Sequence, residues 1–133
     1  HPAEAARLLG VTTETIQQDR FSAVQAIQTR YGGVVVLKGA GTLVCGQDGC
    51  IAVCTGGNPG MASGGMGDVL SGIIGGLMAQ GLTGLEAAQL AVCLHAEAAD
   101  IAASLQGERG LLASDLMVHL QALVNSHEEL SVA

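Results

Sequence analysis

The sequence predicts an α/β fold, in which helices cover both faces of a β-sheet. A continuous apolar run without alternation, Val34–Leu37, is typical of a strand that is buried on both faces. A second β-branched run, Ile51–Thr55, leads through a glycine-rich loop into an apolar segment with helical spacing. Most of the remaining chain has a helical pattern, so few strands are present for these helices to cover. A complete sheet would need strands before His1, and we therefore expect a fragment of a longer polypeptide.

The first third of the chain is expected to be mainly helical. A short helix spans Ala3–Leu9, and Gly10 suits the left-handed position that follows a helix end. Thr12 or Thr13 caps a second helix that runs to about Tyr31. The strand predicted from the apolar run comes next.

The rest of the chain begins with a hairpin and continues with three helices. Asp48-Gly49 supplies the turn between the strands Leu43–Gly46 and Cys50–Thr55. The three helices are expected over Asp68–Gln80, from the capping box Thr83–Glu86 to about Leu105, and after a Ser114 cap.

Two features inside these helices call for an explanation. Gly72, Gly75 and Gly76 weaken the first of them, which predicts either close packing there or the approach of a ligand. His95 lies among apolar residues of the second, and we expect a packed, hydrogen-bonded side chain rather than a ligand.

The stretch Thr55–Gly76 carries the strongest functional signal. It holds nine of the chain's 20 glycines and delivers Gly64–Asp68 to the start of a helix. Free N–H groups and a partial positive charge at a helix start favour an anion, and glycines let the backbone approach a phosphate closely. Asp68 places a carboxylate there that can take a proton from an attacking hydroxyl.

Other interpretations of this stretch compete with an anion site. It could be a flexible loop with Asp68 as an ordinary first-turn acid. A dinucleotide fingerprint fits poorly, because the third glycine of its pattern is missing. A P-loop is excluded, because Lys38 is the only lysine and lies far upstream. Lys38 itself, at the carboxyl end of a predicted strand, is equally compatible with a solvated loop and with a ligand contact.

The composition of the chain excludes several classes of binding partner. The formal net charge of −7 argues against nonspecific binding of nucleic acid or anionic membranes, and no apolar run is long enough to span a bilayer. The cysteines at positions 45, 50, 54 and 93 indicate a reduced, cytoplasmic protein. The spacing of the first three fits no usual zinc pattern, so we expect buried strand thiols.

Three motifs together resemble those of the ADP-dependent NAD(P)H-hydrate dehydratases, in bacteria commonly the C-terminal domain of a bifunctional NAD(P)H-hydrate repair enzyme. They are His1–Gly10, Val36–Thr42 and the specific segment Gly57–Gly72, and the resemblance runs through essentially the whole chain. It implies a ribokinase-like, three-layer α/β/α fold, of which residues 1–133 would be the C-terminal part of a single domain. The family opening is His-Pro-Gly-Glu, whereas Ala3 stands here in place of glycine; a positive φ at this position would cost stability and could shift His1.

The resemblance also implies an activity. S-configured hydrated NADH or NADPH would be dehydrated at the expense of ADP, which yields NAD(P)H, AMP and phosphate. By motif, Asp68 would act on the ring hydroxyl, and the N–H groups of Gly65, Met66 and Gly67 would hold the transferring phosphoryl group. The resemblance also implies the binding residues. The nucleotide would contact Lys38, Gly39, Ala40, Gly41, Thr42 and Gly67, and the hydrated cofactor would contact His1 and Asp68.

Further expectations accompany this activity. Mg²⁺ is expected with the nucleotide, although no ligand for it is evident in the sequence. We also expect a homo-oligomer, fused to or completed by N-terminal sequence. Two alternatives remain open: a ribokinase-like small-metabolite kinase, which would leave a stable phosphorylated product, and a nucleotide-binding domain without turnover.

Overall fold

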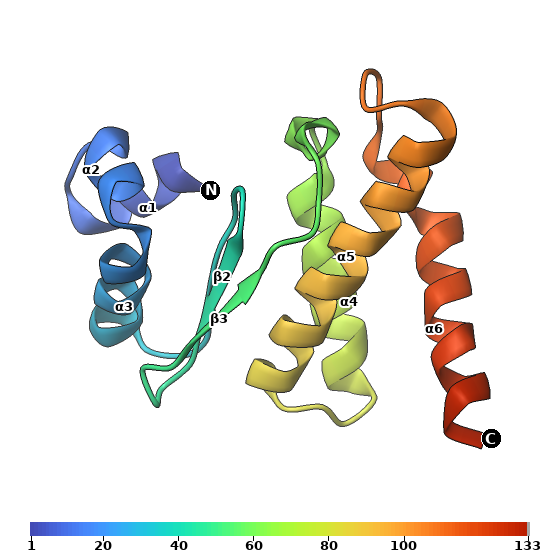
Figure 1. The fold of residues 1–133 in the computed structure, drawn as a ribbon. Coiled ribbons are helices and arrows are strands. Elements are labelled where there is room, and N and C mark those ends of the chain that lie inside the picture. Colours follow the sequence, from blue (N-terminus) through green and yellow to red (C-terminus); the bar gives the residue numbers. More distant parts are fainter. Residues whose placement is uncertain (133) are drawn as a thin grey trace.

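The computed structural model describes the backbone of residues 1–132 and the side chains of residues 1–125 (Figure 1). Its elements are α1 (Pro2–Leu9), α2 (Thr13–Gln18), α3 (Arg20–Tyr31), β1 (Val35–Leu37), β2 (Thr42–Cys45), β3 (Ile51–Cys54), the 3-10 turn η1 (Pro59–Ala62), α4 (Met66–Ala79), α5 (Gly84–Gln106), the 3-10 turn η2 (Ala113–Leu116) and α6 (Met117–Val132).

The three strands form one antiparallel sheet in the order β1-β2-β3, with Leu37 opposite Leu43 and Val44 opposite Ala52. Successive side chains of β2 point to opposite faces of the sheet. Leu43 and Cys45 pack against α1–α3, whereas Val44 packs against α4 and α5. A third apolar cluster joins α4, α5 and α6 on the far side (Figure 1). The prediction of helices on both faces of a sheet, in three layers, is therefore confirmed.

The helical N-terminal part differs from the prediction at one point. Helix α1 ends at Gly10 as expected, with a φ of 68°. The predicted helix from Thr12 or Thr13 to Tyr31 is interrupted, because Asp19 ends α2 and caps α3. The Asp19 carboxylate accepts hydrogen bonds from the Ser22 N–H at 3.0 Å and from the Ser22 hydroxyl at 2.7 Å. These bonds favour a new helix start over continuation of the old helix.

Helix α4 departs from the prediction in two respects. It begins at Met66, two residues earlier than expected, so Gly67 and Asp68 both lie in its first turn. Gly72, Gly75 and Gly76 were expected to allow close packing or the approach of a ligand. In the described structure, a Cβ atom added at any of the three would have no neighbour within 4 Å. They lie on an open face of α4, away from its contacts with α5.

Ala3 has a helical conformation inside α1, and no non-glycine residue in the described structure has a positive φ. The alanine is therefore accommodated without backbone strain. All four cysteines are free, but only Cys45 is buried; the expected burial was wrong for Cys50, which is exposed, and for the half-buried Cys54. Within the described residues, no helix has both the length and the apolar character needed to cross a membrane.

Candidate active site

A cavity of about 510 Å³ lies at the end of the sheet where β1 and β3 finish. Segments far apart in the sequence meet here: the start of α1, the loop after β1, the loop after β3, and parts of α4 and α5. Its lining residues include His1, Lys38, Gly39, Ala40, Gly41, Thr42, Thr55, Gly56, Gly57, Asn58, Met66, Leu70, His95 and Ala96. A cavity of this size, bounded by polar loops and apolar helix faces, is typical of a small-molecule site.

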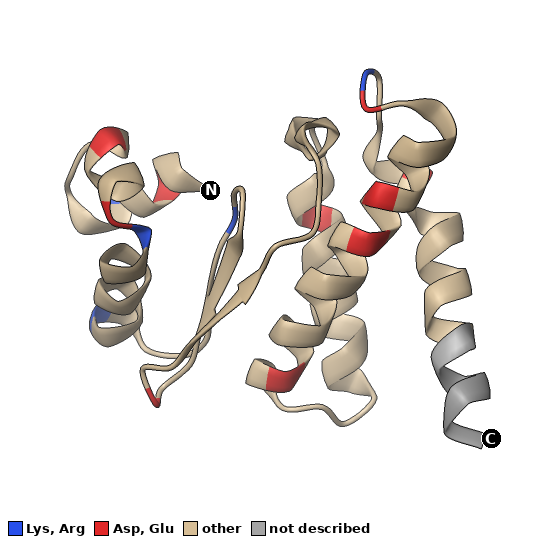
Figure 2. Cartoon of the chain, viewed as in Figure 1, with Lys and Arg blue, Asp and Glu red and all other residues tan. Residues whose placement is uncertain are grey.

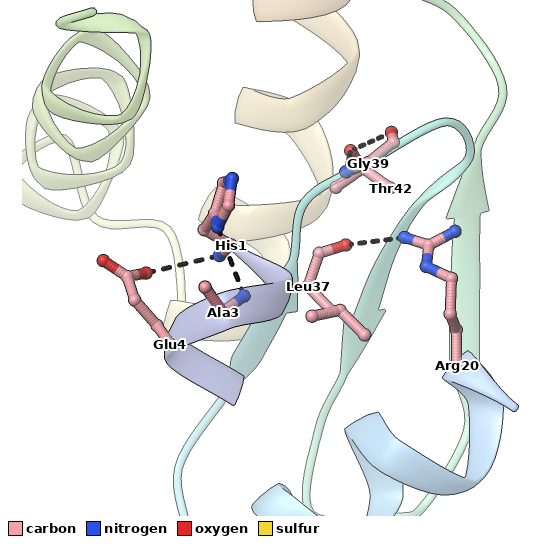
Figure 3. Close-up of polar contacts among 7 residues, drawn as sticks. All are labelled: His1, Ala3, Glu4, Arg20, Leu37, Gly39 and Thr42. Carbon is pink, nitrogen blue, oxygen red and sulfur yellow. Dashed lines mark hydrogen bonds and ion pairs between the residues drawn. The ribbon is translucent and has the colours of Figure 1, made fainter. Parts of the chain in front are cut away.

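The loop of residues 38–42, between β1 and β2, contributes all five of its members to the lining. Inside the loop, Thr42 Oγ1 donates to the Gly39 carbonyl oxygen at 3.2 Å (Figure 3). From outside, Arg20 Nη1 donates to the carbonyl oxygens of Ala40 at 2.7 Å and Gly41 at 3.0 Å, and its Nη2 donates to that of Leu37 at 3.2 Å. No pattern in the sequence indicates this role of Arg20, because its partners lie 17 to 21 residues away.

The start of α4 borders the same cavity through Met66, whereas the predicted site residues Gly65 and Gly67 lie outside its lining. Gly65, with a φ of 86°, occupies the N-cap position and supplies no side-chain cap, so the N-terminal N–H groups of α4 remain available to an anion. Met66 is buried and lines the cavity. A Cβ atom at Gly67 would lie only 2.7 Å from Lys38 Nζ. The ammonium group thus lies beside the positive end of the helix dipole, and this arrangement favours a negatively charged ligand.

The two residues expected to contact the hydrated cofactor occupy different environments. His1 lines the cavity and caps α1, with its Nδ1 accepting from the Ala3 N–H at 3.2 Å (Figure 3). Asp68 follows Gly67 in the first turn of α4, where it is exposed and lies outside the cavity lining. Its carboxylate is therefore open to a molecule that extends beyond the cavity.

The loop of residues 56–60, after β3, is held against α5. Asp100 accepts from the Gly57 N–H at 3.0 Å and from Asn58 Nδ2 at 2.9 Å. A Cβ atom at Gly56 would lie 3.2 Å from the Cβ of Ala96, and one at Gly60 would lie 2.7 Å from the Glu108 carbonyl oxygen. Glycine is needed here for close approach. Asp100, like Arg20, has no pattern in the sequence that indicates this role, since its partners are 42 and 43 residues away.

His95 also lines the cavity, from α5. It is packed as expected, with 4% of its surface exposed, but within the described structure its Nε2 has no hydrogen-bond partner. Burial lowers the pKa of His95, the neighbouring Lys38 lowers it further, and a hydrogen bond with the Met66 backbone raises it as a smaller effect. The ring is consequently neutral at pH 7 and presents an unsatisfied polar atom beside Lys38.

Charge is distributed unevenly around this site. Four of the five basic residues lie in the first 38 positions, whereas helices α4 and α5 carry acidic residues and no basic ones (Figure 2). Lys38 is the one lysine of the chain. Within the described residues, no group of three or more His, Cys, Asp or Glu side chains could hold a metal ion. An anion at this site would meet the Lys38 ammonium group and the backbone N–H groups at the start of α4.

Comparisons with known proteins identify the family of the chain. The sequence profile of the NAD(P)H-hydrate dehydratase family matches residues 1–122. The bifunctional NAD(P)H-hydrate repair enzyme Nnr of Vibrio cholerae is 63% identical over 126 residues, which cover 94% of this chain and 25% of that protein. The ADP-dependent (S)-NAD(P)H-hydrate dehydratase of Neisseria meningitidis is 50% identical over 117 residues, 87% of this chain and 40% of that protein.

Solved structures give the same result. The ADP/ATP-dependent NAD(P)H-hydrate dehydratase of Bacillus subtilis, co-crystallised with ATP/Mg²⁺ and soaked with CoA, superposes with a TM-score of 0.89 at 30% identity. The match covers 95% of this chain and 47% of that one. The chain thus spans about a quarter of the length of the bifunctional relative and about half of this solved dehydratase. From its profile, its relatives and its fold, the chain belongs to the NAD(P)H-hydrate dehydratase family.

Proposed function

We propose that this chain forms part of an enzyme that dehydrates the S form of hydrated NADH or NADPH at the expense of ADP. The observation that carries the proposal is the position of Lys38 Nζ against Gly67, at an uncapped helix start that borders a cavity. A phosphate held there would meet an ammonium group and several N–H groups at once. The printed name of the Neisseria meningitidis relative supports the substrate class, and the charge at this site is compatible with a phosphate-bearing substrate.

The chemistry needs an activated leaving group, because hydroxide leaves poorly. In the proposed reaction, Asp68 takes the proton of the ring hydroxyl, whose oxygen then attacks the β-phosphorus of ADP, and AMP departs. Phosphate next leaves the ring carbon and a neighbouring carbon loses a proton, which restores the double bond of NAD(P)H. The N–H groups of Gly65, Met66 and Gly67 would stabilise the phosphoryl group during transfer.

The other predicted residues take binding roles in this scheme. The loop of residues 38–42 would contact the adenine nucleotide, together with Gly67, and His1 would contact the hydrated cofactor alongside Asp68. The described side chains offer no metal cluster, so any Mg²⁺ would be held chiefly by nucleotide phosphates and water, and no step is assigned to it. A cytoplasmic setting and a homo-oligomeric assembly remain predictions.

The test uses the protein with its full natural sequence, mixed with hydrated NADH, ADP and Mg²⁺, while the absorbance of NADH is followed. We expect NADH to reappear only when ADP is present. Asp68→Asn should lower turnover by about 10²- to 10⁴-fold, because a general base is lost, while ADP affinity changes little. Glu14→Gln, which also removes a first-turn helix acid, is the matched control and should leave turnover unchanged.

Other outcomes would select another function. ADP binding without NADH recovery, together with a stable phosphorylated product in a metabolite screen, would favour the small-metabolite kinase. Binding without any turnover would favour a nucleotide-binding domain. NADH recovery that survives Asp68→Asn would support the dehydratase and remove Asp68 from the role of base.

A further inference from the structure

We infer that Arg20 is a positioning residue for nucleotide binding: from α3, its guanidinium group fixes the backbone of the loop of residues 38–42 in the shape that presents the Gly41 N–H to the cavity. The inference rests on the proposed function, because it assigns that loop to the nucleotide. It concerns a residue that lies outside the cavity lining and acts through the loop.

The contacts of Arg20 span the whole loop. Its Nη2 bonds the Leu37 carbonyl where β1 ends, and its Nη1 bonds the carbonyls of Ala40 and Gly41 just before β2 begins (Figure 3 shows the first). One rigid, planar group therefore holds both ends of the loop at distances of 2.7 to 3.2 Å. Lysine could not reproduce this pattern, because its ammonium is a single point of donation on a flexible stem.

The hydrogen bonds from Arg20 to these carbonyls also orient the N–H group of the loop that can act as a donor. In a trans peptide, the carbonyl and the following N–H point in opposite directions. Because Arg20 draws the Ala40 carbonyl to its own side, the Gly41 N–H points away from the guanidinium. In the described structure this N–H has no hydrogen-bond acceptor, although Gly41 lines the cavity. It is thus a fixed donor that is available to a ligand.

Gly39 makes room for the guanidinium group. A Cβ atom at this position would lie 2.9 Å from Arg20 Nη2 and 3.3 Å from Cζ. The loop and the arginine therefore fit each other closely. Arg20 is itself held in place as the first residue of α3, directly after its Asp19 cap. Three hydrogen bonds to backbone carbonyls and a glycine packed against the guanidinium group indicate that Arg20 has a structural role in this loop and does not merely cover the surface.

The test compares Arg20→Ala and Arg20→Lys with a matched control, Arg30→Ala. Arg30 lies on the same helix, and its Nη1 donates one bond to the Leu8 carbonyl at 3.2 Å, far from the loop. We expect Arg20→Ala to raise the Kd and the KM for ADP about 10- to 100-fold, as a misplaced binding loop would, with kcat changed less than about threefold. Arg20→Lys should recover only a small part, and Arg30→Ala should leave both constants unchanged.

Two more measurements separate positioning from a general loss of structure. Added guanidinium ion should partly restore ADP affinity to Arg20→Ala, while added ammonium ion should not. Hydrogen exchange of the ligand-free protein should become faster at amides 39–42 in Arg20→Ala and in Arg20→Lys, with little change in α5. The lysine variant covers the possibility that the alanine variant fails to fold.

Several results would overturn the inference. Equal effects of Arg20→Ala and Arg30→Ala, or full recovery in Arg20→Lys, would mean that only helix stability or charge matters. If the unaltered protein neither binds ADP nor regenerates NADH, the proposed function fails instead. The exchange experiment still decides the role of Arg20 in that case: faster exchange at amides 39–42 supports it, and unchanged exchange refutes it.

Discussion

Two loops border the cavity, and they are fastened by groups of opposite charge. The loop of residues 38–42 is held by a cation, because Arg20 donates three hydrogen bonds to carbonyl oxygens at its two ends. The loop of residues 56–60 is held by an anion, because Asp100 accepts from the Gly57 N–H and from the Asn58 side chain. Both side chains come from helices, but Arg20 binds backbone carbonyl groups, whereas Asp100 binds a backbone N–H group.

The difference assigns different tasks to the two loops. In the first loop Arg20 binds carbonyl oxygens at both ends, and the Gly41 N–H has no acceptor within the described structure, which suits the binding of an anion. In the second loop a donor is taken by the carboxylate, and a second negative charge nearby would be repelled. Its glycines serve close packing against α5 and residue 108. We therefore expect phosphates to bind on the side of the first loop and of the α4 start.

The largest predicted effect on the free energy of unfolding concerns Gly60. A methyl group there would lie 2.7 Å from the Glu108 carbonyl oxygen and 3.0 Å from Leu111 Cδ2, so the backbone itself must shift. We expect Gly60→Ala to lower the free energy of unfolding by about 1–3 kcal/mol, measured by urea denaturation.

The matched control for this change is Gly76→Ala. A Cβ atom at Gly76 would have no neighbour within 4 Å, and alanine is the better helix former by about 1 kcal/mol. Gly76→Ala should therefore be neutral or stabilising. Similar destabilisation by both changes would show that the second loop does not depend on close packing.

Gly67→Ala should separate binding from stability. The atom that its methyl group would meet, Lys38 Nζ at 2.7 Å, is the end of a flexible side chain, which can move at little cost to the fold. Moving it, however, removes the ammonium from the α4 start. We expect about a 10-fold loss of ADP affinity by calorimetry, equivalent to about 1.4 kcal/mol, with an almost unchanged unfolding midpoint. Unchanged affinity would contradict the placement of phosphate at this point.

Asp100→Asn tests the second loop by removing charge alone. The amide oxygen of the new asparagine can accept only one of the two hydrogen bonds that Asp100 accepts from Gly57 N–H and Asn58 Nδ2. The amide NH₂ group would stand opposite the other donor and cannot accept from it. Because Asp100 is exposed, we expect a loss of about 1 kcal/mol in the free energy of unfolding and little change in ADP affinity. Glu97→Gln, one turn earlier on α5, is the matched control. A loss of ADP affinity as large as that of Gly67→Ala would mean that the two loops do not have separate tasks.

The sequence predicted those features that neighbouring residues determine. The Gly10 helix end, the Asp48-Gly49 hairpin and the Thr83–Glu86 capping box all depend on partners a few residues away, and the structure contains each of them. The glycine stretch correctly predicted a loop that leads into a helix start. The meeting of Lys38 with Gly67 was expected only through the family resemblance, since no local pattern links the two.

The features that were missed depend on distant partners or on competition between local signals. Arg20 and Asp100 have no sequence pattern that indicates the loops they hold. Asp19 did carry a signal, because it precedes Ser22 by three residues, but the prediction followed the helical periodicity and did not consider a cap at this position. The close packing offered as one explanation of Gly72, Gly75 and Gly76 is not found among the described residues, because glycine in a helix indicates a missing side chain and does not tell which neighbour, if any, fills the space. The approach of a ligand to this face stays a prediction.

The smallest predicted effect links the first loop to pH. Burial and the Lys38 ammonium lower the pKa of His95 below its ordinary value of 6.5, so the buried ring resists protonation. In the unfolded chain the same ring takes up a proton as the pH falls below about 6.5, which favours unfolding. His95 therefore leaves stability intact above pH 6.5 and reduces it progressively as the pH falls from there toward the folded pKa. The charged group that acts on the ring is Lys38 from the end of β1, and α4 contributes only the Met66 backbone.

Lys38→Met removes that charge and should raise the pKa of His95, which proton NMR of the ring can follow once His95→Gln has identified its signals. The stability lost between pH 7 and pH 5.5 should shrink by less than about 1 kcal/mol, because burial still opposes protonation. Arg109→Met makes the same change in net charge in the turn between α5 and η2 and should leave the His95 titration where it is. If both variants raise the pKa equally, the effect belongs to the net charge of the protein, and Lys38 does not act on the ring from the first loop. If Lys38→Met alone raises the pKa of His95, the Lys38 ammonium acts electrostatically on groups inside the cavity. A phosphate bound there would experience the same positive charge.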